Sequence, residues 1–168
     1  MTVRPIIAFP DQRLRQTATP VTLFDDQLRT LAADLLDTLR AAPGIGITGP
    51  HIGVLQRIVV LDLPDASGPQ TYVNPEIIHM SSEKIRHEEG SISMQGVAGM
   101  VERSAKIRLR YQDLAGQEQT EEAEGLRAVC HQHEIDQLNG IFWIQKLSPL
   151  RRNRLVTQYE KQKRFRKE

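Results

Sequence analysis

Leucine residues recur at spacings of three and four between positions 25 and 42, which places them on one face of a helix. Asp25 and Asp26 suit the positive end of such a helix, and Pro43-Gly44 stops it. The pattern therefore predicts an amphipathic helix over residues 25–42. The leucines of its apolar face are Leu28, Leu31, Leu35 and Leu39.

Short β-branched and alternating segments follow this helix, and they predict strands. Residues 57–63 read Arg-Ile-Val-Val-Leu-Asp-Leu, and residues 71–78 form a second segment that Pro75 interrupts. Between residues 101 and 123, apolar and basic side chains alternate before a turn at Ala115-Gly116. This last pattern is typical of a hairpin.

A second helix is predicted over residues 126–138, and a third, basic helix over residues 149–168 after the proline at its start. Strands grouped between helices, without a regular β–α–β alternation, favour an α+β fold. We expect one domain over residues 1–168. The residues that share one face of the second helix are Leu126, Val129, Cys130, His133 and Gln137.

Composition narrows the class of protein. The chain has 168 residues, of which 39% are hydrophobic and 26% charged, so one hydrophobic core can serve all of it. No apolar run approaches the ~20 residues that a membrane span needs, and the first residues lack the apolar stretch of a secretory signal. The one cysteine, Cys130, fits a reducing compartment. We therefore expect a soluble, cytoplasmic protein without a membrane partner.

The net charge of +1 hides an uneven distribution. Residues 149–168 hold eight Lys or Arg and two Glu, whereas the rest of the chain carries a net charge of −5. A basic segment on an acidic body points to an anionic partner such as RNA or the ribosome surface, and nothing here indicates DNA. The alternative is a solvated helix with its charges directed outward.

The second predicted helix contains His133-Glu134. When a helix carries His-Glu-x-x-His, its two histidines lie on one face and can bind one Zn²⁺ or Fe²⁺, and the glutamate acts as general base and acid on the metal-bound water. Here the second histidine position is Gln137. A His-Glu pair alone is a weak signal, because it also occurs on helix surfaces.

Three segments together give a stronger signal. They are Gly44-Ile-Gly-Ile-Thr-Gly-Pro-His51, Glu89-Gly-Ser-Ile-Ser93 and Gln132-His-Glu-Ile-Asp-Gln137. In this order and spacing they resemble the motifs G-x-G-x-A-A-x-Q, E-G-C-L-S and Q-H-E-x-D-H of the peptide deformylase family. Further matches extend over essentially the whole chain. The resemblance implies a single α+β domain in which antiparallel strands pack around the central helix that carries the third motif.

The family resemblance also implies an activity and residue roles. Active members are metal-dependent hydrolases that remove the formyl group from the N-terminal methionine of new bacterial proteins, with Fe²⁺ or Zn²⁺ held by one Cys and two His. Their ligand positions correspond to Ser91, His133 and Gln137 here. The general acid/base corresponds to Glu134, and the oxyanion donors correspond to His51 and the backbone N–H of Ile92.

Two of the three metal ligands are therefore replaced. A structural tetrahedral zinc site in a small peptide is worth ~10–16 kcal/mol, and it needs thiolate or neutral imidazole ligands. A serine hydroxyl and a glutamine carbonyl are poor substitutes for them. We expect no bound metal cofactor and no ordinary deformylase turnover, so that the chain is a degenerate homologue, a pseudoenzyme. The alternative is an active hydrolase of weak or altered specificity that uses a rearranged site.

We expect the replaced side chains to form a direct or water-bridged polar cluster with His133, because buried polar groups without partners cost ~1–3 kcal/mol each. Two other arrangements stay open. His51, His133 and Glu134 could form a rebuilt ligand set, or Ser91 could act as a nucleophile with a histidine as base.

The walls of the peptide pocket are preserved better than the metal ligands. The resemblance implies that a methionine side chain lies against apolar residues and that the Gly44–Gly46 segment pairs with the peptide as an added strand. We therefore expect the chain to bind N-terminal Met or formyl-Met peptides; plain core filling is the alternative. These peptide-binding positions are Gly44, Ile45, Gly46, Leu126, Val129 and Cys130.

Three further residues carry expectations of their own. Arg103 matches an arginine that recurs in the family, and we expect it to form a structural ion pair. His131 is predicted to be an exposed surface histidine, and Cys130 a buried part of an apolar wall rather than a reactive thiol. The basic helix is expected to dock on the ribosome, as it does in some bacterial deformylases.

Overall fold

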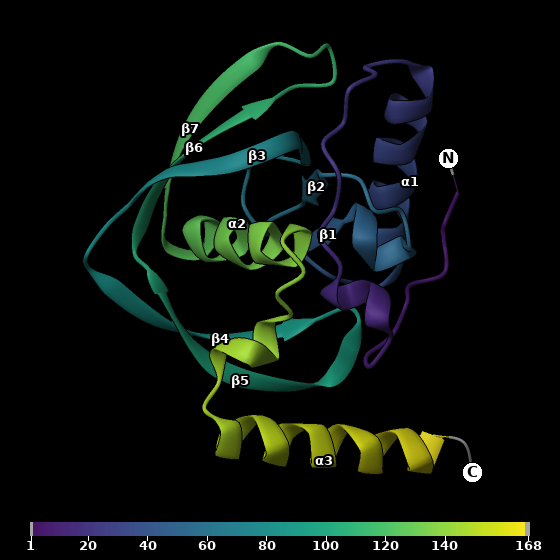
Figure 1. Cartoon of the computed structure of the whole chain (residues 1–168), viewed down its shortest axis with the longest axis vertical. Helices are drawn as coiled ribbons and strands as arrows, with labels where there is room; N and C mark the ends of the chain where they lie inside the picture. The colour runs from purple at the N-terminus through teal and green to yellow at the C-terminus, as the bar shows by residue number, and fades with distance from the viewer. Residues whose placement is uncertain (1, 167–168) are drawn as a thin grey trace.

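The computed structural model describes residues 2–166, and it shows an α+β fold in which the helix α2 lies between two antiparallel sheets (Figure 1). One sheet has the order β1-β2-β3-β6-β7, and the other is the hairpin β4–β5. The helices are α1 (Asp26–Ala41), α2 (Gly125–Leu138) and α3 (Pro149–Arg166), with short 3₁₀ helices η1 (Gln12–Arg15), η2 (Gly49–Ile52) and η3 (Trp143–Lys146). The strands are β1 (Gly46–Thr48), β2 (Ile58–Leu61), β3 (Gln70–Met80), β4 (Lys84–Ser91), β5 (Met94–Ser104), β6 (Lys106–Gln112) and β7 (Glu118–Glu124).

Strand β2 shows why the larger sheet needs a helix on each face. Its four residues are all buried, so its sequence is a continuous apolar run rather than an alternation. Ile58 and Val60 pack in the cluster that contains the leucines of α1, whereas Val59 and Leu61 pack in the cluster that contains Ala128 of α2. Successive side chains of a strand point to opposite faces, so the sheet is covered on both sides.

The three predicted helices are confirmed, with boundaries within about one residue of those expected. The side chain of Asp25 caps α1 by accepting a hydrogen bond from the backbone N–H of Leu28 at 3.1 Å. Helix α3 buries Leu155 and Tyr159 and leaves most of its basic side chains exposed. The last two residues of the predicted third helix, 167 and 168, lie outside the described part of the chain.

Two strand predictions were wrong in extent. Strand β3 continues through Pro75, because a register shift between Val73 and Glu76 places the proline in a bulge of its pairing with β6. Residues 101–104 do not begin the predicted hairpin; they belong to β5, which pairs with β4, and the hairpin itself is β6–β7.

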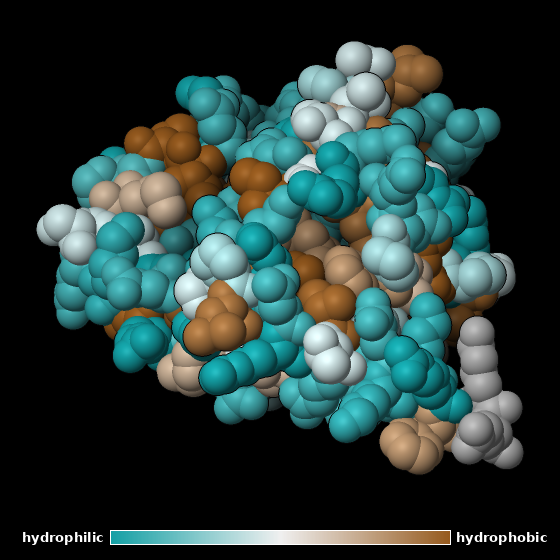
Figure 2. Space-filling view, turned by 60° about the horizontal axis from the view of Figure 1, so that its bottom comes forward, coloured by the Kyte–Doolittle hydropathy of each residue, from teal (hydrophilic) through white to brown (hydrophobic). Residues whose placement is uncertain are grey.

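The hairpin β4–β5 was not predicted as such, and it forms the second wall around α2. Its other face is covered by η3 and α3 through a cluster that includes Val101, Trp143, Leu155 and Tyr159. In Figure 1, α3 lies below the hairpin on the side away from α2. The molecule viewed toward that side is mostly hydrophilic, with apolar residues visible near its centre (Figure 2). Within residues 2–166, none of the helices has the length and apolar character to cross a bilayer.

Candidate functional site

One pocket gathers nearly all the residues that sequence analysis selected. It has a volume of about 420 Å³ and lies between the segment before β1, the tip of the hairpin β4–β5 and the part of α2 from Leu126 to Glu134. Gln137 is the exception among these residues, since it does not line the pocket. Those that line it are Gly44, Ile45, Gly46, His51, Ser91, Ile92, Leu126, Val129, Cys130, His133 and Glu134.

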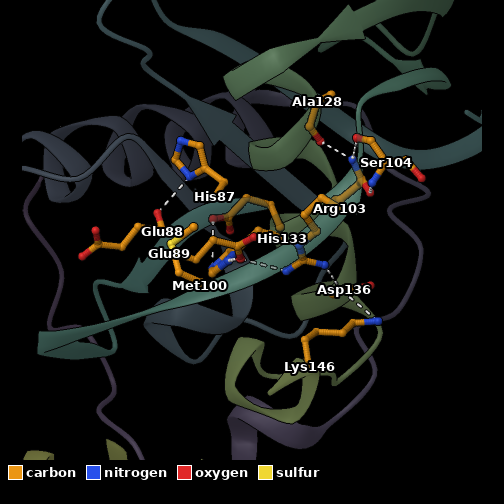
Figure 3. A network of polar contacts seen from close by, with 12 residues as sticks. His87, Glu88, Glu89, Met100, Arg103, Ser104, Ala128, His133, Asp136 and Lys146 are labelled. Carbon is orange, nitrogen blue, oxygen red and sulfur yellow. Dashed lines mark hydrogen bonds and ion pairs between the residues drawn. The ribbon is translucent and has the colours of Figure 1, made fainter. Parts of the chain in front are cut away.

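A chain of buried ionic contacts fixes His133 (Figure 3). Its Nδ1 hydrogen-bonds to Oε1 of Glu89 at 2.8 Å. Arg103 holds both oxygens of the same carboxylate, from Nε at 2.8 Å and from Nη2 at 2.9 Å, and it reaches Asp136 at 2.6 Å through Nη1. The predicted structural ion pair of Arg103 is confirmed. Its bidentate contact is the geometry that best orients a carboxylate.

These contacts shift the pKa values of both partners. Burial alone would raise the pKa of Glu89, but the hydrogen bonds from Arg103 and His133 outweigh it and lower this pKa to about 2. Burial alone would lower the pKa of His133, yet the hydrogen bond to Glu89 and the nearby Glu134 raise it. The two shifts therefore have one cause, the close contact of a buried imidazole with a buried carboxylate.

Glu134 is fully buried on the α2 wall. Its Oε1 lies 3.8 Å from Nε2 of His133, and its Oε2 has no hydrogen-bond partner among residues 2–166. Burial raises its pKa to about 7. Gly46 faces this carboxylate closely, because a Cβ added there would lie 2.9 Å from Oε1 of Glu134.

His51, which belongs to η2, lines the pocket and is buried. The backbone N–H of Thr48 donates to its Nδ1 at 2.9 Å, and Oγ1 of Thr48 lies 2.9 Å from the same atom. Burial, with a smaller effect from His133, lowers the pKa of His51 to about 3. The next residue after Thr48 is Gly49, where a Cβ would lie 2.5 Å from the carbonyl oxygen of Val54, so this turn excludes the alanine of the family motif.

The expected direct cluster of Ser91, His133 and Gln137 was wrong. The amide of Gln137 donates to the carbonyl oxygen of Leu14 at 2.7 Å, which ties α2 to η1. The hydroxyl of Ser91 accepts from the backbone N–H of Ser93 at 3.0 Å. No hydrogen bond between Ser91 and a histidine occurs in the described chain, so a serine nucleophile with a paired base is not formed. Each replaced ligand has instead taken a backbone partner of its own.

The donor set does not fit a catalytic metal ion. Only His133 keeps a ligand side chain at its position, and the contacts of Ser91 and Gln137 direct their polar atoms to backbone groups. No group of three His, Cys, Asp or Glu side chains within residues 2–166 is placed to hold a metal. The rebuilt set of His51, His133 and Glu134 is therefore also wrong.

Cys130 and His131 are neighbours on α2, and both are buried. Cys130 is buried as predicted, and burial raises the pKa of its thiol to about 12, which makes it unreactive. His131 is not exposed: it is 1% accessible, contacts Glu121 at 2.6 Å and packs edge-on against Tyr72. Helix α2 is covered on all sides, so it has no solvent face for a histidine to occupy.

Sequence analysis missed the role of Glu89, although this residue was part of a motif. The available signal was its place two residues before Ser91 in the same motif, and both side chains line the pocket even though the pairing of β4 with β5 is irregular between them. It also missed Thr48, whose contact with His51 depends on the turn between β1 and η2. Thr48 and His51 are three residues apart across the end of a strand, and this spacing alone does not predict that their side chains meet.

The chain is similar to one group of known proteins along almost its whole length. A family model described as polypeptide deformylase matches residues 3–153. A protein of Brucella suis biovar 1 named peptide deformylase-like is 67% identical over 164 residues, which cover 98% of this chain and 100% of that protein. A peptide deformylase of the same bacterium is 42% identical over 164 residues, covering 96% of this chain and 94% of that protein.

Solved structures extend the similarity to the backbone. The crystal structure of a peptide deformylase from Ehrlichia chaffeensis in complex with actinonin has a TM-score of 0.92 to this chain at 33% identity. The match covers 98% of this chain and 99% of that one.

Proposed function

Because the chain belongs to the polypeptide deformylase family, we propose that it is a member without deformylase activity that binds peptides carrying an N-terminal methionine or formyl-methionine. One observation carries this proposal: the pocket keeps its apolar and backbone walls, while two of the three metal-ligand positions hold side chains bonded elsewhere.

The loss of activity follows from the cost of the missing ligands. Losing even an outer partner of a ligand reduces metal affinity or activity by ~10–100-fold, and here two direct ligands are absent. Without a bound ion, no water has its pKa lowered to about 7, so Glu134 has no activated nucleophile to deprotonate. We therefore propose that the protein holds neither Fe²⁺ nor Zn²⁺.

The peptide-binding part rests on the pocket itself. Leu126, Val129 and Cys130 line one wall with apolar surface suited to a methionine side chain. Strand β1 is the edge strand of the larger sheet, so the segment that leads into it can pair with an extended peptide. The Ehrlichia relative is bound to actinonin, which supports a ligand site in this fold.

The presence of two family members in one bacterium supports a role apart from deformylation. Brucella suis has both a peptide deformylase and the deformylase-like protein. Where a deformylase is present, the deformylase-like chain is free to lose its metal and keep its peptide site. We propose a cytoplasmic protein that acts close to protein synthesis.

The basic helix α3 supports a second contact, with the ribosome. Its exposed Lys and Arg side chains make no ion pair with an acidic residue in the described part of the chain, so they are available for phosphate groups. Co-sedimentation with ribosomes should fall steeply as salt rises, and replacing Lys163 and Arg164 by Glu should abolish it. The same reversal at Arg108, an exposed residue of β6, is the matched control. Binding that ignores salt would contradict this contact.

An enzymatic alternative has one observation in its favour. Glu134 keeps its position, and a pKa raised to about 7 suits a general base at neutral pH. If the chain were a weak hydrolase, turnover of a formyl-Met peptide would disappear in the variant Glu134→Gln.

Calorimetric titration with formyl-Met-Ala-Ser, followed by analysis of the peptide, tests the proposal. We expect saturable binding and recovery of the peptide with its formyl group intact. The variant Cys130→Trp should block binding by filling the pocket, while the nearly isosteric Cys130→Ser should retain it. Binding that survives Cys130→Trp, or release of formate by the unsubstituted protein, would contradict the proposal.

A further inference from the structure

A second pocket lies beside the first two turns of α3. It has a volume of about 440 Å³ and is bounded by the N-terminal segment with η1, by η3 and by α3. Among residues 2–166, this pocket and the first one share no lining residue, so the two are separate sites. Most of the second lining is apolar, and these side chains belong to Phe9, Pro10, Leu14, Phe142, Ile144 and Val156.

The apolar walls of this second pocket are fixed by packing and by hydrogen bonds. The ring of Phe9 stacks on Phe142 with centroids 5.6 Å apart, and it meets the ring of Tyr159 edge-on at 6.0 Å. The backbone N–H of Phe9 donates to the carbonyl oxygen of Ser93 at 2.8 Å, which ties the N-terminal segment to the hairpin β4–β5. Oε1 of Gln145 accepts from the backbone N–H of Phe142 at 2.9 Å. Because the walls are held in place in advance, a ligand has little ordering cost to overcome.

Two arginine side chains line the same pocket without partners. They are Arg15 of η1 and Arg152 of α3, and within residues 2–166 neither guanidinium makes a hydrogen bond or an ion pair. The acidic residue of the lining, Asp11, does not neutralise them, because Arg13 holds both of its oxygens. The two contacts run from Nε of Arg13 at 3.1 Å and from its Nη2 at 2.7 Å. The pocket therefore combines apolar walls with two cations that are free to bind an anion.

We infer that this second pocket binds a small carboxylic acid with an apolar body. The body packs against Phe9, Ile144 and Val156, and the carboxylate pairs with a guanidinium. An arginine and a carboxylate form two parallel hydrogen bonds, so arginine recognises this group well. Arg152 is half-buried and Arg15 is exposed, so Arg152 contributes more, because water screens exposed charges. This site goes beyond the proposed function and does not depend on it.

The size and composition of the second pocket favour a small acid over a longer anion. Pockets for small molecules have volumes of ~300–1,000 Å³, with mostly apolar walls and a few placed polar groups, and this pocket matches both features. An extended polyanion such as RNA would find exposed cations along α3, but it has no need of an apolar floor. The carboxylate of Asp11 also favours a ligand with one negative charge over a phosphate with two.

Calorimetric titration with 3-phenylpropionate tests the inference, with two probes that each lack one part of it. The neutral 3-phenylpropanamide lacks the charge, and propionate lacks the ring. The complete acid should bind roughly 10-fold or more tightly than the amide, the effect of hydrogen bonds to a charged group. It should also bind more tightly than propionate, because burial of the ring adds to the affinity. Equal binding of the acid and the amide, or no saturable binding of the acid, would overturn the inference.

Variants of the arginines locate the charge that matters. Arg152→Gln should lower the affinity for 3-phenylpropionate by roughly 10-fold, and Arg15→Gln should lower it less. The matched control is Arg154→Gln, an exposed residue of α3 outside the pocket lining, which should leave the affinity unchanged. Equal losses in Arg152→Gln and Arg154→Gln would overturn the assigned site. An RNA of ten uridines that binds more tightly than the acid, and loses affinity when Val156→Trp fills the pocket, would assign the pocket to RNA instead.

Methyl NMR of the unsubstituted protein places the ligand without any variant. The acid should shift the methyl resonances of Ile144 and Val156, which line the second pocket, and leave those of Val129 in the first pocket unchanged. Its affinity should be the same when formyl-Met-Ala-Ser is present. Shifts confined to Val129, or competition with the peptide, would place the acid in the first pocket and overturn the inference without affecting the proposed function.

Discussion

Restoring the two missing ligands should restore a metal site, because the contacts that orient His133 are in place. The perturbation is the double substitution Ser91→Cys and Gln137→His. Arg103 still fixes Glu89, and Glu89 still orients His133. The introduced cysteine and histidine would therefore add two ligands to a first ligand that is already oriented. The double variant should bind one equivalent of Zn²⁺ or Fe²⁺.

The expected change in stability combines the removal of two hydrogen bonds with the binding of one ion. Replacing Gln137 removes its hydrogen bond to Leu14, and replacing Ser91 removes the one it accepts from Ser93, at a cost of about 1 kcal/mol each. An ion present at 1,000 times its dissociation constant stabilises the folded chain by about 4 kcal/mol. The net gain of about 2 kcal/mol should raise Tm by roughly 4–8 °C for a protein of this size.

Anaerobic thermal unfolding with metal, and again with a chelator, measures this change. The single variants Ser91→Cys and Gln137→His are the matched controls, and each should show a smaller metal-dependent shift than the double variant. The reasoning is refuted if the double variant retains no equimolar ion, or if the unsubstituted protein shows the same metal-dependent rise in Tm.

Three other predictions concern the supporting structure. Arg103→Leu leaves the buried carboxylate of Glu89 without its bidentate partner and should lower the free energy of unfolding by ~3–5 kcal/mol. Arg108→Leu, at an exposed pair, should cost less than ~1 kcal/mol, and similar urea midpoints for the two variants would contradict this. Burial would raise the pKa of Glu121, but the hydrogen bond from His131 is part of a set that lowers it to about 2. The stabilising contribution of Glu121 is therefore present above its unfolded pKa near 4.5 and is lost as the pH falls toward 2. The variant Glu121→Gln should make the free energy of unfolding depend less steeply on pH in this acid range. An unchanged dependence would contradict the prediction. Native Cys130 should resist iodoacetamide at pH 8 and react once unfolded; rapid native labelling would show that its thiol is not held protonated.

The helices could be predicted from the sequence because their patterns are local. The leucine spacing of α1 and its cap at Asp25 lie within one segment, and the proline that starts α3 needs no distant partner. The hairpin β4–β5 could not be predicted in this way. Its first strand is rich in charged residues and its second contains Gly96 and Gly99, so it depends on packing against α2, η3 and α3.

The members of the site could be selected from motif spacing, but their partners could not. Gln137 and Leu14 are 123 positions apart, so no local pattern predicts their hydrogen bond. The prediction of an exposed His131 assumed that α2 has a solvent face. Because α2 lies between two sheets, ten of its fourteen residues are buried, and helical periodicity no longer indicates exposure.

The central claim is that one imidazole, one hydroxyl and one amide at the ligand positions cannot hold a catalytic ion. Elemental analysis of protein purified under anaerobic conditions, with a formyl-Met-peptide assay on the same sample, tests it most directly. We predict much less than one equivalent of iron or zinc and no formate release. One equivalent of either ion, together with turnover that Glu134→Gln abolishes, would contradict it.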